Sequence, residues 1–199
     1  MIDYNLLIKD LNKSCSSFFN ESTFYFHKKG PYTYISTGDN CSKASNWKKG
    51  APLPVNAIKW FDNLWVYSEI KLLDTEVILT ISIFQGDQVD ESKTQLLRAE
   101  WDSYSNKMES HPQPHWHITS NIALENTFQE YAEVLEQDGF LASLEDEKTK
   151  VINMNNFHFP MCANWFNEHY DKNEVNKENI IKWYCGILSD VESQLNYCK

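Results

Sequence analysis

The run of residues from 64 to 101 constrains the fold more than any other feature of the sequence, because it contains three strand-like stretches in succession. These stretches cover residues 64–73, 76–84 and 94–101. In the second stretch, every other residue from Val77 to Ile83 is a branched apolar one, a pattern typical of a half-buried antiparallel strand. Only two residues separate the first two stretches, which suits a hairpin. An antiparallel meander is therefore expected.

Amphipathic helices are predicted before and after this run. Apolar residues recur at intervals of three and four residues between Leu7 and Phe18, which predicts a helix over about residues 3–19. Near the C-terminus, one apolar stripe at helical spacing comprises Ile180, Trp183 or Tyr184, Ile187, Val191, Leu195 and Cys198. Residues 32–37 alternate β-branched and aromatic side chains and predict a further strand. We predict an α+β fold in which an antiparallel meander of four or five strands is packed against the N-terminal and C-terminal helices.

The whole chain, residues 1–199, is interpreted as a single α+β domain. Its length suits one core with peripheral insertions, and neither an internal repeat nor a linker divides it. Residues 38–54 are rich in Gly, Asp, Asn, Ser, Lys and Pro, which predicts a loop insertion. Trp47 and Trp60 are expected to pack this loop onto the core, with stacking on a ligand as the alternative. Residues 121–150 are acidic and predict a helical insertion.

The formal net charge of −10 disfavours extended contact with nucleic-acid phosphates, because such binding depends on Lys and Arg side chains. No stretch approaches the roughly 18 consecutive apolar residues that a membrane-spanning helix needs, so we expect a cytoplasmic protein without a membrane segment. The five cysteines are scattered and include no C-x-x-C pair. This spacing favours reduced packing residues over a disulfide framework or a thiolate zinc site.

Three charged residues alternate along the last of the three strand-like stretches. In an extended chain Arg98, Glu100 and Asp102 share one face, and three charged groups cannot form an ordinary apolar core. Two interpretations stay open. The first is a solvent-exposed face on which Arg98 bridges the two carboxylates, and the second is a face turned toward a functional site.

Residues 111–117 contain three of the six histidines of the chain. In an extended segment His115 and His117 point the same way, so their imidazoles are candidate ligands of one transition metal. Asp102 or Glu100 of the neighbouring strand would supply an oxygen ligand. We take His115, His117 and Asp102 as the candidate metal ligands. Such a set favours zinc, manganese or iron over calcium.

The same residues suit two further interpretations. A histidine beside a carboxylate can act as general base and acid without a metal. The candidate catalytic residues are then Asp102, His115, His117, Glu100 and Arg98. Histidines in a proline-rich edge segment can equally form a rigid recognition loop, and the sequence does not choose between these interpretations. His158 is a further imidazole that could join the cluster, although a histidine among apolar residues is more typical of core packing.

The order of features between residues 64 and 119 resembles the TumE-type toxins of bacterial toxin–antitoxin systems. Members of that family have antiparallel strands, then a strand with an Arg and an Asp, then a Pro-and-His segment that ends in H-x-H. The matching positions here are Arg98, Asp102, Pro114, His115 and His117. The match covers under a third of the chain, since the segments before and after it have no counterpart in the short family members. The resemblance implies a bacterial toxin, stress or phage-defence setting.

The sequence supports two functional hypotheses. In the first, the chain is a bacterial defence or toxin-type protein in which Asp102, His115 and His117 form a metal or acid–base site for phosphate-ester or nucleotide chemistry. Its cofactor would be a divalent transition metal such as zinc or manganese, and its partner an antitoxin. In the second hypothesis, the chain is a non-catalytic subunit that binds a larger defence protein through its aromatic loops and acidic surface.

Overall fold

The computed structural model of the chain describes residues 2–48, 51–73, 76–91, 93–103, 114–118 and 175–197. In chain order its elements are α1 (Tyr4–Cys15), the 3-10 turn η1 (Ser16–Phe18), β1 (Tyr25–Gly30), β2 (Thr33–Thr37), β3 (Cys41–Lys48), β4 (Ala51–Lys59), β5 (Leu64–Leu72), β6 (Val77–Gln85), β7 (Thr94–Asp102), β8 (His115–Ile118) and α4 (Lys177–Tyr197). The strands form one antiparallel sheet in the order β1-β2-β5-β6-β7-β8, and β4 joins the β3–β4 hairpin to β5. The predicted α+β class and antiparallel sheet are confirmed.

The predicted strand number is wrong, because the described part of the sheet has eight strands and not four or five. In β1 only Phe26 is buried, so no apolar alternation marks this strand in the sequence. The loop predicted for residues 38–54 is also wrong, since β3 and β4 pair over their whole lengths there. Backbone hydrogen bonds hold this hairpin, and Pro52 and Pro54 are tolerated because that part of β4 pairs with β3 alone.

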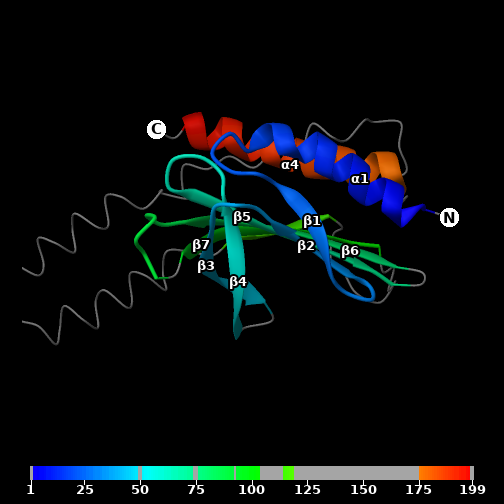
Figure 1. Ribbon diagram of the computed structural model, residues 1–199, viewed down its shortest axis with the longest axis horizontal. Helices are drawn as coiled ribbons and strands as arrows, with labels where there is room; N and C mark the ends of the chain where they lie inside the picture. Colours follow the sequence, from blue (N-terminus) through cyan, green and yellow to red (C-terminus); the bar gives the residue numbers. More distant parts are fainter. Residues whose placement is uncertain are drawn as a thin grey trace, which may run out of the picture.

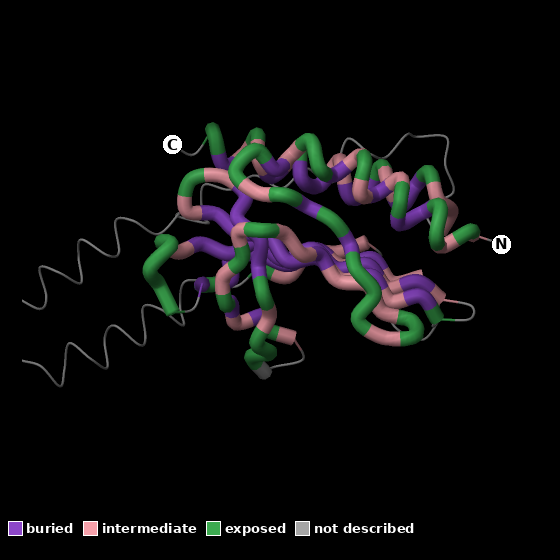
Figure 2. The backbone as a smooth tube through the Cα atoms, viewed as in Figure 1, coloured by how far each residue is buried: buried purple, intermediate pink, exposed green. Residues whose placement is uncertain are grey.

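Both predicted helices are present and lie side by side on one face of the sheet (Figure 1). Asp3 caps α1, since its carboxylate accepts a hydrogen bond from Leu6 N at 3.1 Å. The apolar faces of α1 and α4 pack on alternate residues of the central strands, among them Leu79, Ile81 and Ile83. Figure 2 shows the result as a buried layer between the helices and the sheet. None of the described helices is long and apolar enough to cross a membrane.

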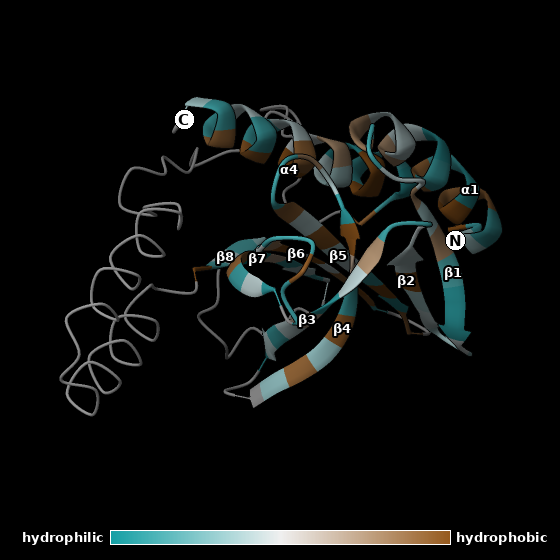
Figure 3. Cartoon of the chain, turned by 60° about the vertical axis from the view of Figure 1, so that its left-hand side comes forward, coloured by the Kyte–Doolittle hydropathy of each residue, from teal (hydrophilic) through white to brown (hydrophobic). Residues whose placement is uncertain are grey.

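The residues between these apolar positions form a polar face on the other side of the sheet. Thr80 and Ser82 of β6 lie on it, and β7 places Glu100 opposite Thr80 and Arg98 opposite Ser82. The β3–β4 hairpin lies against this face, where Ser82 Oγ donates to Asn46 Oδ1 at 2.9 Å. Figure 3 shows the hairpin on the side of the sheet away from α1 and α4. This polar face is where the predicted site residues lie.

The two tryptophans expected to pack the loop behave differently. Trp60 is fully buried in the main core, as predicted, whereas Trp47 on β3 is 46% exposed. Of the cysteines, Cys15, Cys41 and Cys185 are free thiols. The predicted acidic insertion near residues 121–150 and the histidines His111 and His158 lie outside the described residues.

A polar clasp at Asp39, formed with Ser22 and Thr23, joins the segment before β1 to the turn between β2 and β3. Asp39 Oδ1 accepts hydrogen bonds from Thr23 N at 2.8 Å and Ser22 Oγ at 2.9 Å. Gly38 is required beside it, because a Cβ atom there would collide with the carbonyl oxygen of Thr23. The hydrogen bond from the Thr23 amide, followed by that from the Ser22 hydroxyl, lowers the pKa of Asp39 below its ordinary value.

We expect this clasp to make stability depend on pH in the acidic range. Because the folded-state pKa of Asp39 is depressed, its contribution is fully present above the unfolded value of about 3.9 and is lost as pH falls through the folded value. The Asp39→Asn variant should therefore lose less stability than the wild type between about pH 4 and pH 2. Urea unfolding at a series of pH values measures the free energy of unfolding of both proteins. Parallel pH profiles for the wild type and Asp39→Asn would show that Asp39 does not contribute to the pH dependence.

Candidate metal centre

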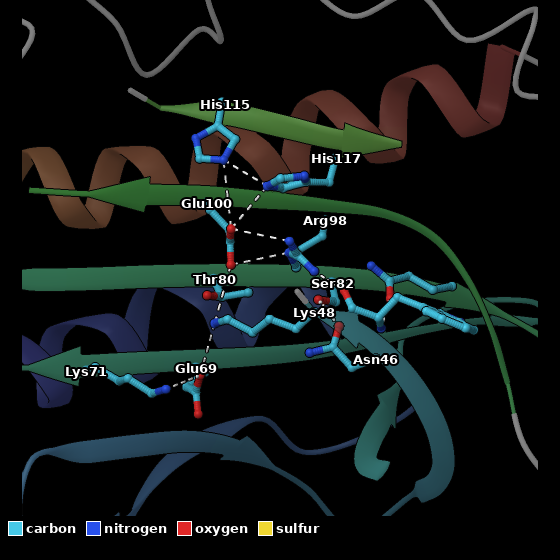
Figure 4. Close-up of polar contacts among 12 residues, drawn as sticks. Asn46, Lys48, Glu69, Lys71, Thr80, Ser82, Arg98, Glu100, His115 and His117 are labelled. Atoms are coloured by element: carbon cyan, nitrogen blue, oxygen red, sulfur yellow. Dashed lines mark hydrogen bonds and ion pairs between the residues drawn. The ribbon is translucent and has the colours of Figure 1, made fainter. Parts of the chain in front are cut away.

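The pairing of β7 with β8 brings the predicted histidines to the charged face of β7. In the register of this pair His115 lies opposite Glu100 and His117 opposite Arg98. Both histidines point to the same side of the strand, as the sequence predicted, and this side is the polar face of the sheet (Figure 4). The remaining residues of β8, Trp116 and Ile118, fall on the opposite side.

One side-chain atom each of Glu100, His115 and His117 forms a small triangle on the polar face. His115 Nε2 and His117 Nε2 lie 2.8 Å apart. Glu100 Oε2 lies 3.1 Å from His117 Nε2 and 3.8 Å from His115 Nε2. A circle through three atoms with these separations has a radius of about 1.9 Å, and three ligands of a tetrahedral zinc ion at about 2.0–2.1 Å lie on a circle of the same size. The triangle therefore fits a first-row transition metal.

The carboxylate in this group is Glu100 and not Asp102. The sequence allows both as oxygen ligands, and our prediction names Asp102 as the metal ligand. Among the described residues the group that could hold a metal ion consists of Glu100, His115 and His117. The strand register explains the correction: Glu100 lies directly opposite His115, whereas Asp102 lies two residues further along β7, roughly 7 Å away along the strand.

Glu100 is held in its ionised form by the cations around it. Its Oε1 atom lies 3.2 Å from Arg98 Nε and 3.4 Å from Lys48 Nζ. Burial raises the pKa of this carboxyl group, but Lys48, Arg98 and His117 together outweigh burial, so its pKa is below the ordinary value. An ionised carboxylate is the form that binds a metal. Oε1 of Glu100 therefore contacts Lys48 and Arg98, while Oε2 faces the two histidines and is also within reach of Arg98.

Arg98 positions the carboxylate of Glu100. Its side chain is buried, and its Nη1 atom donates a hydrogen bond to the carbonyl oxygen of Trp47 on β3. Its Nη2 atom donates to Glu100 Oε2 at 3.4 Å, so one guanidinium group contacts both the β3–β4 hairpin and the candidate ligand Glu100. The predicted contact of Arg98 with a neighbouring carboxylate is thus present for Glu100. Arg98 is a positioning residue, because both sides of its guanidinium group are occupied.

Three residues of the site were not predicted from the sequence. Lys48 Nζ lies 3.8 Å from Glu69 Oε2, and Lys71 Nζ lies 3.4 Å from the same atom. Glu69 and Lys71 alternate with the buried Ile70 on β5, a pattern that could have placed them on the non-core face. Lys48 had no such signal, since it falls in the loop predicted for residues 38–54 and reaches the site only because the hairpin folds over the sheet.

Comparisons with known proteins were made for the sequence and for the fold. No protein-family model, curated protein or solved structure matches the chain. The resemblance to TumE-type toxins therefore stays a prediction, and the geometry of the site is the main basis on which a function can be proposed.

Proposed function

We propose that this protein is a metal-dependent hydrolase of phosphate esters or nucleotides, with Glu100, His115 and His117 as the protein ligands. The observation that carries the proposal is the triangle of two imidazole nitrogens and one carboxylate oxygen, all within 4.8 Å of one another. Two His and one carboxylate are the ligand set of catalytic zinc sites and of non-haem iron centres, which keep positions open for water or substrate. Zinc, manganese and iron(II) are therefore the candidate metals.

The charges beside the ligands favour an anionic substrate. Lys48, Lys71 and Arg98 contribute three positive charges to the polar face, against two negative charges from Glu69 and Glu100. A divalent ion would add two more positive charges, so the site is locally positive within a chain of net charge −10. When bound, such an ion makes water nucleophilic at neutral pH, while fixed cations stabilise the charge that develops on a phosphoryl group.

The proposed setting is bacterial toxin or phage-defence biology in the cytoplasm, with an antitoxin as the partner. The support for this setting is the resemblance of Arg98, Asp102, Pro114, His115 and His117 to the matching positions of TumE-type toxins. In that setting the hydrolytic activity would be harmful to the cell and would need suppression by the partner. Growth arrest on expression of the wild type, and normal growth on expression of a variant without the histidine ligands, would agree with it.

Hydrolysis of a chromogenic phosphate ester tests the proposed activity. Metal-free protein is loaded with one equivalent of zinc, manganese or iron(II) and assayed on bis(p-nitrophenyl) phosphate and p-nitrophenyl phosphate. We expect metal-dependent release of nitrophenol that falls by at least about 100-fold in the His115→Ala/His117→Ala double variant. The matched control is His27→Ala, since His27 is exposed on β1, and its activity should stay within about twofold of the wild type.

Two results would overturn this proposal. The first is the absence of hydrolysis with each of the three metals. The second is equal activity in the wild type and the double variant, which would assign the hydrolysis to a contaminant or to another part of the chain.

A second candidate function is that of a non-catalytic subunit, and the β3–β4 hairpin favours it. Trp47 is 46% and Leu53 48% exposed, so the hairpin presents large apolar side chains to solvent. In this case a Trp47→Ala/Leu53→Ser variant should lose a protein partner that the His115→Ala/His117→Ala variant still binds. Loss of partner binding in neither variant would exclude the hairpin as the binding surface.

A further inference from the structure

The hydroxyl group of Thr80 is buried next to the candidate metal centre and has no hydrogen-bond partner among the described residues. Thr80 lies on β6 between Glu69 of β5 and Glu100 of β7, which are its neighbours in the two strand registers. Its side chain is 1% exposed, and among the described residues no group forms a hydrogen bond with its Oγ1 atom. An unpartnered buried hydroxyl lowers the stability of a fold. The Thr80 hydroxyl is therefore a candidate for binding a ligand.

Lys48 brings a second hydrogen-bond donor to the same place. Its Nζ atom lies between the carboxylates that flank Thr80, 3.4 Å from Glu100 Oε1 and 3.8 Å from Glu69 Oε2 (Figure 4). Both distances exceed the roughly 2.7–2.9 Å of a strong charge-assisted hydrogen bond. The side chain of Lys48 is 19% exposed and flexible, so its ammonium group can move toward an incoming anion.

The neighbouring donors on this face already have partners. Ser82 Oγ donates to Asn46, and the guanidinium group of Arg98 contacts Trp47 and Glu100. The negative charges are also balanced, because Lys71 pairs with Glu69 at 3.4 Å and a metal ion would neutralise Glu100. Within the described part of the polar face, the Thr80 hydroxyl and the Lys48 ammonium are thus the donors best placed to bind a ligand oxygen beside the metal ligands.

We infer that Lys48 and Thr80 form a binding subsite for a phosphoryl oxygen of the substrate. This inference rests on the proposed function and names the substrate class of that site, a tetrahedral phosphate ester. In the bound state the Lys48 ammonium group moves from the carboxylates to the phosphoryl oxygen, and the Thr80 hydroxyl donates a hydrogen bond to the same group. The phosphorus atom is then held next to Glu100 and the two histidines, where hydrolysis takes place.

Binding of inorganic phosphate to the Thr80→Val variant tests this subsite, because valine has the shape of threonine without its hydroxyl. Isothermal titration of the zinc-loaded proteins should give phosphate binding that is about 5- to 10-fold weaker in Thr80→Val and at least about 10-fold weaker in Lys48→Gln. The melting temperature of Thr80→Val should equal or exceed that of the wild type, since an unpartnered hydroxyl has been removed. Thr37→Val on β2 is the matched control and should bind phosphate like the wild type.

A different result would assign Thr80 a structural role. If Thr80→Val binds phosphate like the wild type, or melts at a lower temperature, the hydroxyl serves the fold and the subsite is wrong. Zinc binding and hydrolysis with unchanged phosphate affinity in both variants would remove the subsite and leave the proposed function. Phosphate binding that depends on Thr80 in a protein that binds no metal would remove the metal centre and leave the subsite.

Discussion

Replacement of Glu100 by glutamine is expected to lower the affinity of the protein for zinc by about 100-fold or more. Removal of residues that only orient metal ligands costs about 10- to 100-fold in affinity, and Glu100 is itself one of the three proposed ligands. Glutamine keeps the shape of the side chain but loses the negative charge that the metal requires. Competition with a chromophoric chelator measures the affinity, and Glu91→Gln serves as a control because Glu91 is exposed in a loop.

The same substitution should destabilise the metal-free protein. Arg98 is 5% exposed and Lys48 lies 3.4 Å from Glu100, so both cations lose the carboxylate that compensates for their burial. We expect the free energy of unfolding to fall by about 1–3 kcal/mol, as for other buried groups that lose one partner. Urea unfolding of chelated protein measures this value. Unchanged zinc affinity in Glu100→Gln would remove Glu100 from the set of ligands, whatever its effect on stability.

Replacement of Trp183 by alanine is expected to lower the free energy of unfolding by about 3–5 kcal/mol, the usual range for a large aromatic side chain in a core. Trp183 lies on the inner face of α4 and is 1% exposed. Its ring centroid lies 6.1 Å from that of Trp101 on β7, so it packs α4 against the strand that carries Glu100. Alanine would leave a cavity between the helix and the sheet.

Trp47→Ala is the matched control for this prediction, since it removes the same side chain from a half-exposed position on β3. Its carbonyl oxygen still accepts the hydrogen bond from Arg98, so we expect a loss of about 1 kcal/mol or less. Urea unfolding of the two variants and the wild type measures the difference. Equal losses in the two variants would contradict the assignment of Trp183 to the core.

The elements predicted correctly from the sequence are those in which one face is apolar. Helices α1 and α4 and strands β5, β6 and β7 each bury alternate or helically spaced apolar residues, and this periodicity is visible without the structure. Strands β1 and β3 lack such a pattern, because most of their side chains are exposed or polar. They are held by backbone hydrogen bonds to neighbouring strands, and these bonds impose no apolar periodicity on the sequence.

Only the part of the site that depends on alternation along a single strand was predicted from the sequence. Alternation along an extended chain was enough to place His115 with His117, and Arg98 with Glu100, on common faces. The choice of Glu100 over Asp102 depends on the register between β7 and β8, which periodicity alone does not fix. Lys48 lies 52 residues before Glu100 in the chain and contacts it only after the β3–β4 hairpin has folded over the sheet. Thr80 alternates with apolar core residues on β6 as Ser82 does, so the sequence pattern does not distinguish the two hydroxyls.

The metal content of protein purified without a histidine tag tests the central claim most directly. Elemental analysis after loading with zinc and removal of excess metal should find one equivalent per chain in the wild type and in His27→Ala. The His115→Ala/His117→Ala variant should retain less than about one tenth of this amount. A wild-type protein that retains no more metal than the double variant would contradict the assignment of Glu100, His115 and His117 as a metal centre.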